Sequence, residues 1–342
     1  MHKFIFIIAL LLPTLAFSQE KGTMASIHSR LFELVSGADT IEFIQTGEQL
    51  TAPKPVLLFF QGSLPRPLVL DFENGALQLV NFNFDYTKLI GRYHLVTIAM
   101  PFTPAVCKLS ATNNNACYVP DPKGAPDAFE PRYLRANYLD TYVARGQAVV
   151  DFLLRQDWVD KQQILALGHS QGSKVALKVA LSRPQISRLG FFSGNPLGRF
   201  DQFVREYRLA ENKGEMSSAA AQAGIDQLYR DWEELYKNPL DNSEPSGDTN
   251  RATTSFSENF VDDLLALNIP VYVAYGTRDT GSQPCDLLPL EFIRQGKRNL
   301  TLKPYPGWGH NFEETDDTGR SDFNRMHWQE VVEAFLEWSG KP

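Results

Sequence analysis

Short runs of apolar residues recur along the chain, separated by segments in which apolar residues have helical spacing. Runs of four to six residues suit strands that are buried on both faces of a sheet. We expect strands at Thr40–Gln45, Pro55–Phe60, Leu95–Met100, Ile164–Leu167, Arg188–Ser193, Pro270–Tyr275 and Leu300–Pro304. We expect helices over Tyr133–Gln156, Gln171–Leu181 and Asp322–Trp338. Strands that alternate with helices predict the α/β class, with a mostly parallel central sheet covered by helices.

Two segments interrupt this alternation. Pro101–Pro131 is polar and contains several prolines, and a loop of that length in a compact domain usually has a function. Asn195–Asn268 is rich in helix-forming residues and becomes polar, with Gly, Pro and Ser, at Asp241–Ser257. We interpret this second segment as a helical insertion that ends in a mobile stretch.

Residues 1–18 resemble an export signal. They have a basic start at Lys3, an apolar stretch and a small-residue end, in which Ala16 and Ser18 precede the expected cleavage before Gln19. The apolar stretch is shorter than the roughly 20 residues that span a bilayer. A retained N-terminal anchor is the alternative. We therefore expect the mature protein to be exported, either to a periplasm or into the medium, without stable membrane insertion.

Cysteine usage fits an oxidising compartment. Cys107 and Cys117 lie ten residues apart in the polar loop, which predicts a structural disulfide between them. Cys285 is left over and is expected to be a buried or partly buried free thiol. The cysteines and histidines lack the spacing of metal ligands, so no metal site is expected.

The overall composition narrows the functional classes. The 342 residues include 33 Lys and Arg against 40 Asp and Glu, a net charge of -7, which argues against binding to nucleic acid. Hydrophobic residues make up 43% and charged residues 21%, values typical of a soluble globular protein with a large core. The length alone permits either one domain with an insertion or two domains.

The strongest local signal is Gly168-His169-Ser170-Gln171-Gly172, a G-x-S-x-G motif. It lies between an expected strand and an expected helix, which is the setting that the motif requires. Side chains in place of the two glycines would meet neighbouring backbone in so tight a turn. The turn exposes the Ser170 hydroxyl at a helix N-terminus, which favours developing negative charge. Ser170 is therefore the candidate nucleophile.

A serine nucleophile needs a base to take its proton, usually a histidine. His310 lies in the loop Gly307-Trp308-Gly309-His310, after the last expected strand and before the final helix. His327, on the expected final helix, is the alternative base. The other histidines are His2, His28, His94 and His169, and we expect the side chain of His169 to point away from Ser170 and pack internally.

The histidine in turn needs a carboxylate that fixes its tautomer. Asp279 follows a buried strand and is the candidate, with Asp286 and Glu313 as alternatives. The chain order Ser170, Asp279, His310 is typical of one fold among the serine-triad enzymes.

Two backbone N–H groups are expected to stabilise the oxyanion. One is the amide of Gln171, the residue after the nucleophile. The other comes from the turn Gln61-Gly62-Ser63 after an expected strand, and Ser63 is the candidate donor. An ordinary strand-ending turn is the alternative interpretation of this segment.

Together these motifs resemble the α/β-hydrolase superfamily over residues 40–340. The resemblance implies Ser170 as nucleophile, His310 as base and Asp279 as acid. It also implies that residues 195–268 form a lid, since members carry one between the sixth and seventh strands. Gln61 stands where many members have a histidine before the oxyanion glycine.

The resemblance implies an acyl-transfer enzyme, because members that act on halides or epoxides have an aspartate in place of Ser170. We expect an exported serine hydrolase that cleaves a carboxylic ester of a small acyl substrate, without a cofactor. A thioesterase or a peptidase would use the same triad. A catalytically idle homologue that binds a ligand or partner is the alternative of another class. The triad is spread over residues 170–310, which predicts a single domain over residues 19–342.

Overall fold

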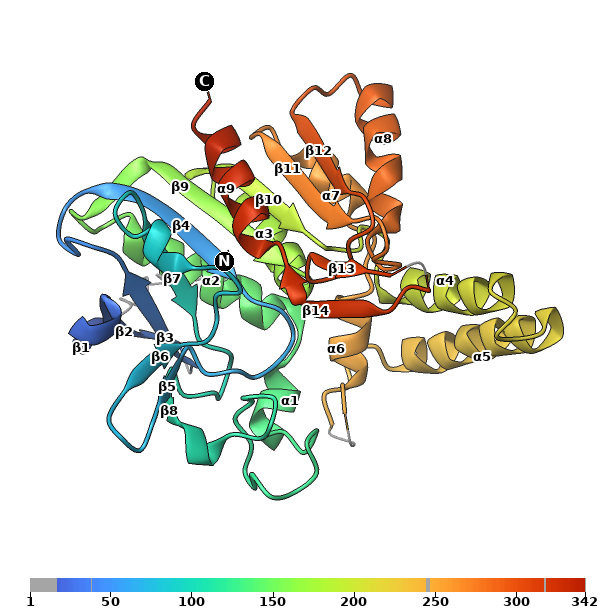
Figure 1. Cartoon of the computed structure of the whole chain (residues 1–342), viewed down its shortest axis with the longest axis horizontal. Helices are drawn as coiled ribbons and strands as arrows, with labels where there is room; N and C mark the ends of the chain where they lie inside the picture. The colour runs from blue at the N-terminus through green and yellow to red at the C-terminus, as the bar shows by residue number, and fades with distance from the viewer. Residues whose placement is uncertain (1–16, 38, 244–246, 317, 342) are drawn as a thin grey trace, which may run out of the picture.

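A nine-stranded sheet forms the centre of the described chain (Figure 1). The computed structural model describes residues 17–37, 39–243, 247–316 and 318–341. The strand order is β1-β2-β3-β7-β4-β9-β10-β11-β12. In that order the strands are Phe17–Met24, Ser29–Ser36, Asp39–Thr46, His94–Ile98, Lys54–Phe60, Val159–His169, Ile186–Phe192, Val271–Gly276 and Leu300–Tyr305. The strands from β7 to β12 in this order run parallel, which confirms the predicted α/β class.

The seven predicted strands are present as β3, β4, β7, β9, β10, β11 and β12. The sequence did not reveal β1 and β2, which pair antiparallel at one edge of the sheet. Edge strands are less buried than central ones, so they lack a continuous apolar run: the last two residues of β2 are exposed.

Helices cover both faces of the sheet (Figure 1). The helices are α1 Pro131–Ala136, α2 Leu139–Leu153, α3 Gln171–Ser182, α4 Arg199–Asn212, α5 Ser218–Lys237, α6 Asn250–Ser255, α7 Val261–Ala266, α8 Leu288–Arg294 and α9 Trp328–Ser339. Side chains of α2, α3, α7 and α8 share one core with Val56 and Leu58 of β4. Those of α9 share another with Leu57 and Phe59. From Val56 to Phe60, β4 is apolar because alternate residues enter different cores, and each buried side chain contributes about 1.5–3 kcal/mol.

Two predicted helices differ from the observed ones. Tyr133–Gln156 is divided into α1 and α2 at Asn137, whose φ of -78° and ψ of 65° are not helical. The Asn137 side chain accepts from the Tyr142 hydroxyl at 2.8 Å and donates to Asp248 at 3.0 Å, which holds the break in place.

The second difference lies at Asp322–Trp338, where the predicted helix begins only at Trp328. The first part is instead β14 (Ser321–Met326), which pairs antiparallel with β13 (Glu313–Thr315). All six residues of β14 are exposed, so a helix there would have no apolar face to bury.

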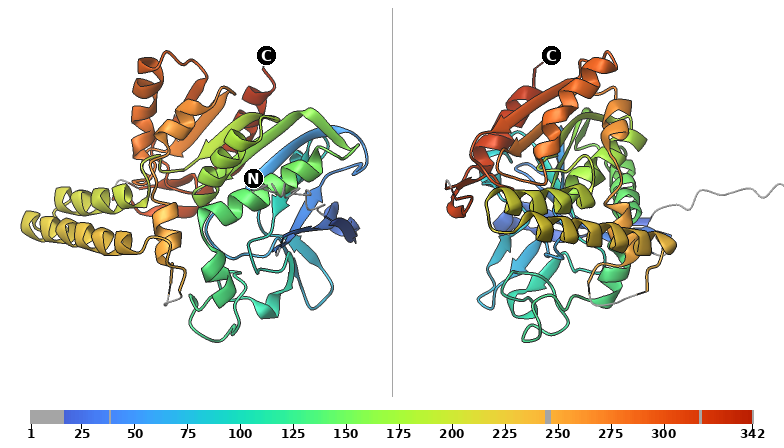
Figure 2. Two further views of the ribbon diagram at one scale, coloured as in Figure 1. Left: turned by 180° about the vertical axis from the view of Figure 1, so that it is seen from behind. Right: turned by 90° about the vertical axis from the view of Figure 1, so that its right-hand side faces the viewer.

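The predicted helical insertion lies between β10 and β11 and contains α4, α5, α6 and α7. α4 and α5 lie side by side and project from the body of the molecule (Figure 1, Figure 2). The stretch that we predicted to be mobile, Asp241–Ser257, includes α6, which begins where the Thr249 side chain accepts from the Ala252 N–H. This local cap explains why a polar sequence forms a helix here. Residues 244–246 lie outside the described residues.

The predicted polar loop, Pro101–Pro131, contributes a strand to a small second sheet. Its β8 (Val106–Lys108) belongs to the order β6-β5-β8, with β5 at Val69–Asp71 and β6 at Leu77–Leu79. The predicted disulfide was wrong, because Cys107 and Cys117 are buried free thiols. Each Sγ lies near a backbone carbonyl of its own segment, Lys108 O at 3.4 Å and Asn115 O at 3.7 Å respectively. Cys285 is a buried free thiol, as expected.

The N-terminal segment is described only in part. Residues 1–16 of the expected export signal lie outside the described residues, and Phe17 and Ser18 begin β1. Among the residues that the structure describes, no helix combines the length and apolar character needed to cross a membrane. In the same part of the chain, no group of His, Cys, Asp and Glu side chains is arranged to hold a metal ion.

Candidate active site

Ser170 occupies a sharp turn between β9 and α3. Its φ of 57° and ψ of -122° are an uncommon conformation for a residue with a side chain. A Cβ on Gly168 would lie 2.1 Å from the Gly172 carbonyl oxygen, and one on Gly172 would lie 2.2 Å from that of Phe60. Both glycines are therefore required for the close packing that presents Ser170 at the start of α3.

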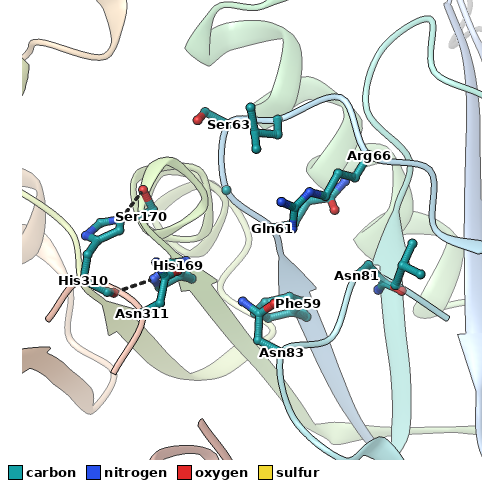
Figure 3. Close-up of a pocket in the computed structure, with 13 residues that line it drawn as sticks. Phe59, Gln61, Ser63, Arg66, Asn81, Asn83, His169, Ser170, His310 and Asn311 are labelled. Carbon is teal, nitrogen blue, oxygen red and sulfur yellow. Dashed lines mark hydrogen bonds between the residues drawn. The ribbon is translucent and has the colours of Figure 1, made fainter. Parts of the chain in front are cut away.

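The structure brings Ser170, His310 and Asp279 together in one hydrogen-bonded chain. His310 Nε2 lies 3.0 Å from Ser170 Oγ, and His310 Nδ1 lies 2.8 Å from Asp279 Oδ2. Asp279 follows β11 and His310 follows β12, and these neighbouring parallel strands end at the same edge of the sheet. Figure 3 shows the bond between His310 and Ser170.

The alternative residues have other partners. Asp286 accepts a hydrogen bond from the Tyr275 hydroxyl, and the carboxylate of Glu313 accepts from the Asn311 N–H at 2.7 Å. His327 lies 3.1 Å from Glu314. Among these candidates, His310 and Asp279 are therefore the two that hydrogen bonds link to Ser170 in the described part of the chain.

The negative charges beside His310 stabilise its protonated form and so make the imidazole a stronger base. Burial lowers the pKa of His310, but the hydrogen bond and charge of Asp279, aided by Glu313, outweigh it, so the pKa lies above the usual 6.5. Since 41% of the His310 side chain is exposed, water also solvates its charged form. Burial alone would raise the pKa of Asp279, yet the hydrogen bonds from His310 and Ser282 hold it below 3.8.

His169 supports the active-site loop. It is buried as predicted, and its Nε2 lies 3.0 Å from the carbonyl oxygen of His310. Burial lowers the pKa of His169 to about 3, so the ring is neutral and donates its Nε2–H to this carbonyl. Sequence reasoning missed this role, for which the only local signal is the position of His169 beside Ser170.

The two expected oxyanion donors, Gln171 and Ser63, line one cavity together with Ser170. Gln171 begins α3, where backbone N–H groups have no acceptor within the helix. The Gly62 backbone is close, since a Cβ built on it would be 3.8 Å from Ser170 Cβ. The Tyr133 hydroxyl donates to the Ser63 carbonyl at 2.6 Å, which fixes the peptide that follows Ser63.

Two cavities open at Ser170. We call the first the amide-lined cavity, because the side-chain amides of Gln61, Asn81, Asn83 and Asn311 line it, together with Arg66; it has a volume of about 250 Å³ (Figure 3). We call the second, of about 310 Å³, the helix-side cavity; it is lined by residues of α3 and α4, including Lys174, Arg199 and Phe203, and by Phe256.

Lys174 of the helix-side cavity is an unusual buried lysine. Its Nζ donates to the Phe256 carbonyl at 2.6 Å and lies 5.2 Å from the centre of the Phe260 ring. Burial and the nearby charge of Arg199 lower the pKa of Lys174 to about 7.

A ring of hydrogen bonds joins the helical insertion to Gln171, the residue after Ser170. Arg199 of α4 donates to Gln171 Oε1 at 2.8 Å and to Asp248 Oδ2 at 2.6 Å. Asn137 Nδ2 donates to Asp248 at 3.0 Å, and Gln171 Nε2 donates to Asn137 at 3.4 Å. The insertion is thus connected directly to the turn that holds Ser170.

Comparisons with known proteins agree with this geometry at the level of the fold. No family model and no curated protein matches the chain by sequence. Solved structures match it across most of its length, including an acetyl xylan esterase from a Thermoanaerobacterium species, with a TM-score of 0.53, 12% identity and coverage of 95% of this chain and 88% of that one.

Two further structures extend the comparison. An acetyl xylan esterase from a Paenibacillus species has a TM-score of 0.51 and 14% identity, and the match covers 96% of this chain and 89% of that one. An acylaminoacyl peptidase from Pyrococcus horikoshii has a TM-score of 0.51 and 12% identity, with 90% and 41% covered. Strand order, the turn at Ser170 and these matches together show that the chain has the α/β-hydrolase fold.

Proposed function

We propose that this protein is a serine hydrolase that cleaves carboxylic esters through an acyl-enzyme. The observation that carries the proposal is the hydrogen-bonded chain from Ser170 Oγ to His310 Nε2 and from His310 Nδ1 to Asp279 Oδ2, at 3.0 and 2.8 Å. A positioned base activates the serine hydroxyl, and a buried carboxylate fixes the tautomer of that base.

The reaction begins when Ser170 Oγ attacks the ester carbonyl carbon and its proton passes to His310 Nε2. The oxyanion so formed accepts hydrogen bonds from the backbone N–H groups of Gln171 and Ser63, each worth about 2.7–4 kcal/mol. The bond from carbon to the alcohol oxygen then breaks, and His310 gives its proton to that oxygen. Water attacks the acyl-enzyme, His310 takes a proton from it, and the carboxylic acid leaves while Ser170 regains its hydrogen.

Cavity size and the structural matches support an ester of small or medium size. Cavities of about 250 and 310 Å³ lie at or below the lower end of the roughly 300–1,000 Å³ typical of small-molecule sites. Two of the matched structures are acetyl xylan esterases. A thioesterase or a peptidase would use the same triad. The peptidase is the alternative because one of the matched structures is an acylaminoacyl peptidase.

We further propose that the protein is exported and that residues 195–268 act as a lid. The pattern of residues 1–18 supports export, with cleavage before Gln19 and a mature single domain over residues 19–342. The bonds from Arg199 to Gln171 support the lid, because they tie the insertion to the catalytic turn. N-terminal sequencing of protein secreted or released from a periplasm tests the cleavage position, and a mature N-terminus at Met1 would contradict it.

A fluorophosphonate probe tests the proposed enzyme directly. We expect the probe to form a covalent bond to Ser170 in the wild-type protein and none in Ser170→Ala, as seen in the mass of the labelled peptide. His310→Ala should label much more slowly, because the base is gone. If neither the wild type nor Ser170→Ala is labelled, the result would instead favour a catalytically idle binding protein.

A substrate panel separates the remaining classes. It comprises esters, thioesters and peptides that share an acetyl group, followed by esters of increasing acyl length. We expect the acetyl ester to be hydrolysed fastest. A thioester or peptide turned over faster than the matched ester would overturn the ester assignment and leave the triad chemistry intact.

A further inference from the structure

Asn81 presents an unsatisfied amide to the amide-lined cavity. The residue is only 5% exposed, yet neither its Oδ1 nor its Nδ2 has a hydrogen-bond partner in the described part of the chain. Gln61 Nε2 and Arg66 Nε, which line the same cavity, are likewise buried without a partner. Figure 3 shows Gln61, Arg66 and Asn81 across the cavity from Ser170 and His310.

Buried polar groups are normally paired, so three unpaired ones around a single cavity indicate that a ligand satisfies them. They come from two separate segments, the loop after β4 and the loop after β6. Their convergence beside Ser170 is therefore a property of the folded site and not of one turn.

The chemistry of Asn81 limits the ligand. Its Nδ2 needs an acceptor and its Oδ1 needs a donor. A carboxylate only accepts and would leave Oδ1 facing negative charge, and an alkyl group would satisfy neither atom. A hydroxyl both donates and accepts, so neighbouring hydroxyls match the asparagine amide and the donors of Gln61 and Arg66.

We propose that the amide-lined cavity binds the alcohol half of a hydroxyl-rich ester, such as an acetylated monosaccharide. The proposal rests on the proposed ester hydrolysis and names its substrate class. The volume of about 250 Å³ is below the range typical of drug-sized ligands, which suits one sugar ring in the cavity. His310 and Ser170 line the same cavity, so an ester oxygen of the bound sugar lies beside the nucleophile and base.

Two acetates that share an acyl group and a ring size test the proposal: a monoacetate of methyl xyloside and cyclohexyl acetate. The wild type should hydrolyse the sugar acetate with a kcat/KM at least about tenfold higher than that for cyclohexyl acetate, because a site built for hydroxyls rejects an analogue without them. Methyl xyloside should also inhibit 4-nitrophenyl acetate hydrolysis competitively, whereas cyclohexanol at the same concentration should not.

The variant Asn81→Leu keeps the side-chain size and removes both polar atoms. We expect it to reduce the preference for the sugar acetate to within about threefold, chiefly through KM. Asn114→Leu, an exposed asparagine outside the cavity, is the matched control and should retain the wild-type preference. If Asn81→Leu does not fold, the inhibition assay on the wild type tests the proposal, and no inhibition by methyl xyloside would overturn it.

The outcomes separate this proposal from the one on which it rests. If the wild type hydrolyses none of the three esters, including 4-nitrophenyl acetate, the proposed ester hydrolysis itself is refuted. Hydrolysis of cyclohexyl acetate as fast as the sugar acetate would overturn hydroxyl recognition alone. A preference for an acetylated uronic acid over the neutral sugar would also overturn it, since Arg66 would then be binding a carboxylate.

Discussion

Replacing Asp279 with asparagine removes a charge and almost none of the volume of the side chain. Oδ2 of Asp279 accepts from His310 Nδ1 at 2.8 Å and from Ser282 Oγ at 2.5 Å, and Oδ1 accepts from the Gly281 N–H at 3.2 Å. If the asparagine nitrogen takes the Oδ2 position, it donates to His310 Nδ1. The imidazole proton then sits on Nε2, where it prevents acceptance of the Ser170 proton.

The structure also indicates which orientation the asparagine adopts. In the opposite orientation its nitrogen faces the Gly281 N–H, two donors 3.2 Å apart in a buried site. An unpaired buried donor costs about 1–3 kcal/mol, so the inhibitory orientation is favoured by roughly 5- to 150-fold. Loss of the charge that stabilises the imidazolium adds to this effect. We expect kcat to fall by about 10³–10⁴, or about 4–5.5 kcal/mol in activation free energy.

Release of 4-nitrophenol from 4-nitrophenyl acetate measures this effect, with thermal unfolding as the check on folding. Asp286→Asn is the matched control, because an amide oxygen accepts the bond from the Tyr275 hydroxyl as well as a carboxylate does. Its kcat should stay within about threefold of wild type. If folded Asp279→Asn keeps more than about a tenth of wild-type kcat, Asp279 does not act as the triad acid.

Three further predictions address pH, the turn and the buried lysine. Because the base must be neutral and Asp279 raises the pKa of His310, kcat/KM should fall as pH decreases, with a midpoint above 6.5; a pH–rate profile with a lower midpoint would contradict this. In Gly172→Ala the new Cβ would lie 2.2 Å from the Phe60 carbonyl oxygen. Calorimetry should therefore show that the free energy of unfolding falls by about 1–3 kcal/mol or more. An unchanged Tm would refute the close packing. Unfolded lysine keeps its proton to about pH 10.5, whereas folded Lys174 loses it near pH 7. The free energy of unfolding of the wild type, measured with denaturant, should therefore rise between these pH values relative to that of Lys174→Met. A difference between the two proteins that does not change with pH would contradict the lowered pKa of Lys174.

Several features of the protein could be predicted from local sequence because local physics fixes them. Apolar runs such as Pro55–Phe60 indicated strands, since only a strand in the middle of a covered sheet is buried on both faces. Gly168 and Gly172 indicated the turn that exposes Ser170, because no other residue fits there. The order of Ser170, Asp279 and His310 indicated the fold, since each lies in a recognisable setting after a strand.

Other features depended on how neighbouring segments are arranged in space, which their residue patterns did not reveal. β14 replaces the start of a predicted helix because β13 offers it a partner strand. Cys107 and Cys117 suit a disulfide by spacing, yet each thiol lies beside a backbone carbonyl of its own segment.

The tertiary structure also decided the roles of two side chains in the site. His169 contacts the carbonyl of His310, 141 residues away, and Asn81 lines the cavity at Ser170, where its amide atoms have no hydrogen-bond partner among the described residues. No periodicity or motif encodes such contacts, because they arise only when the ends of separate strands meet. The sequence alone therefore determined the fold class and the candidate triad, whereas packing between distant segments decided what surrounds Ser170.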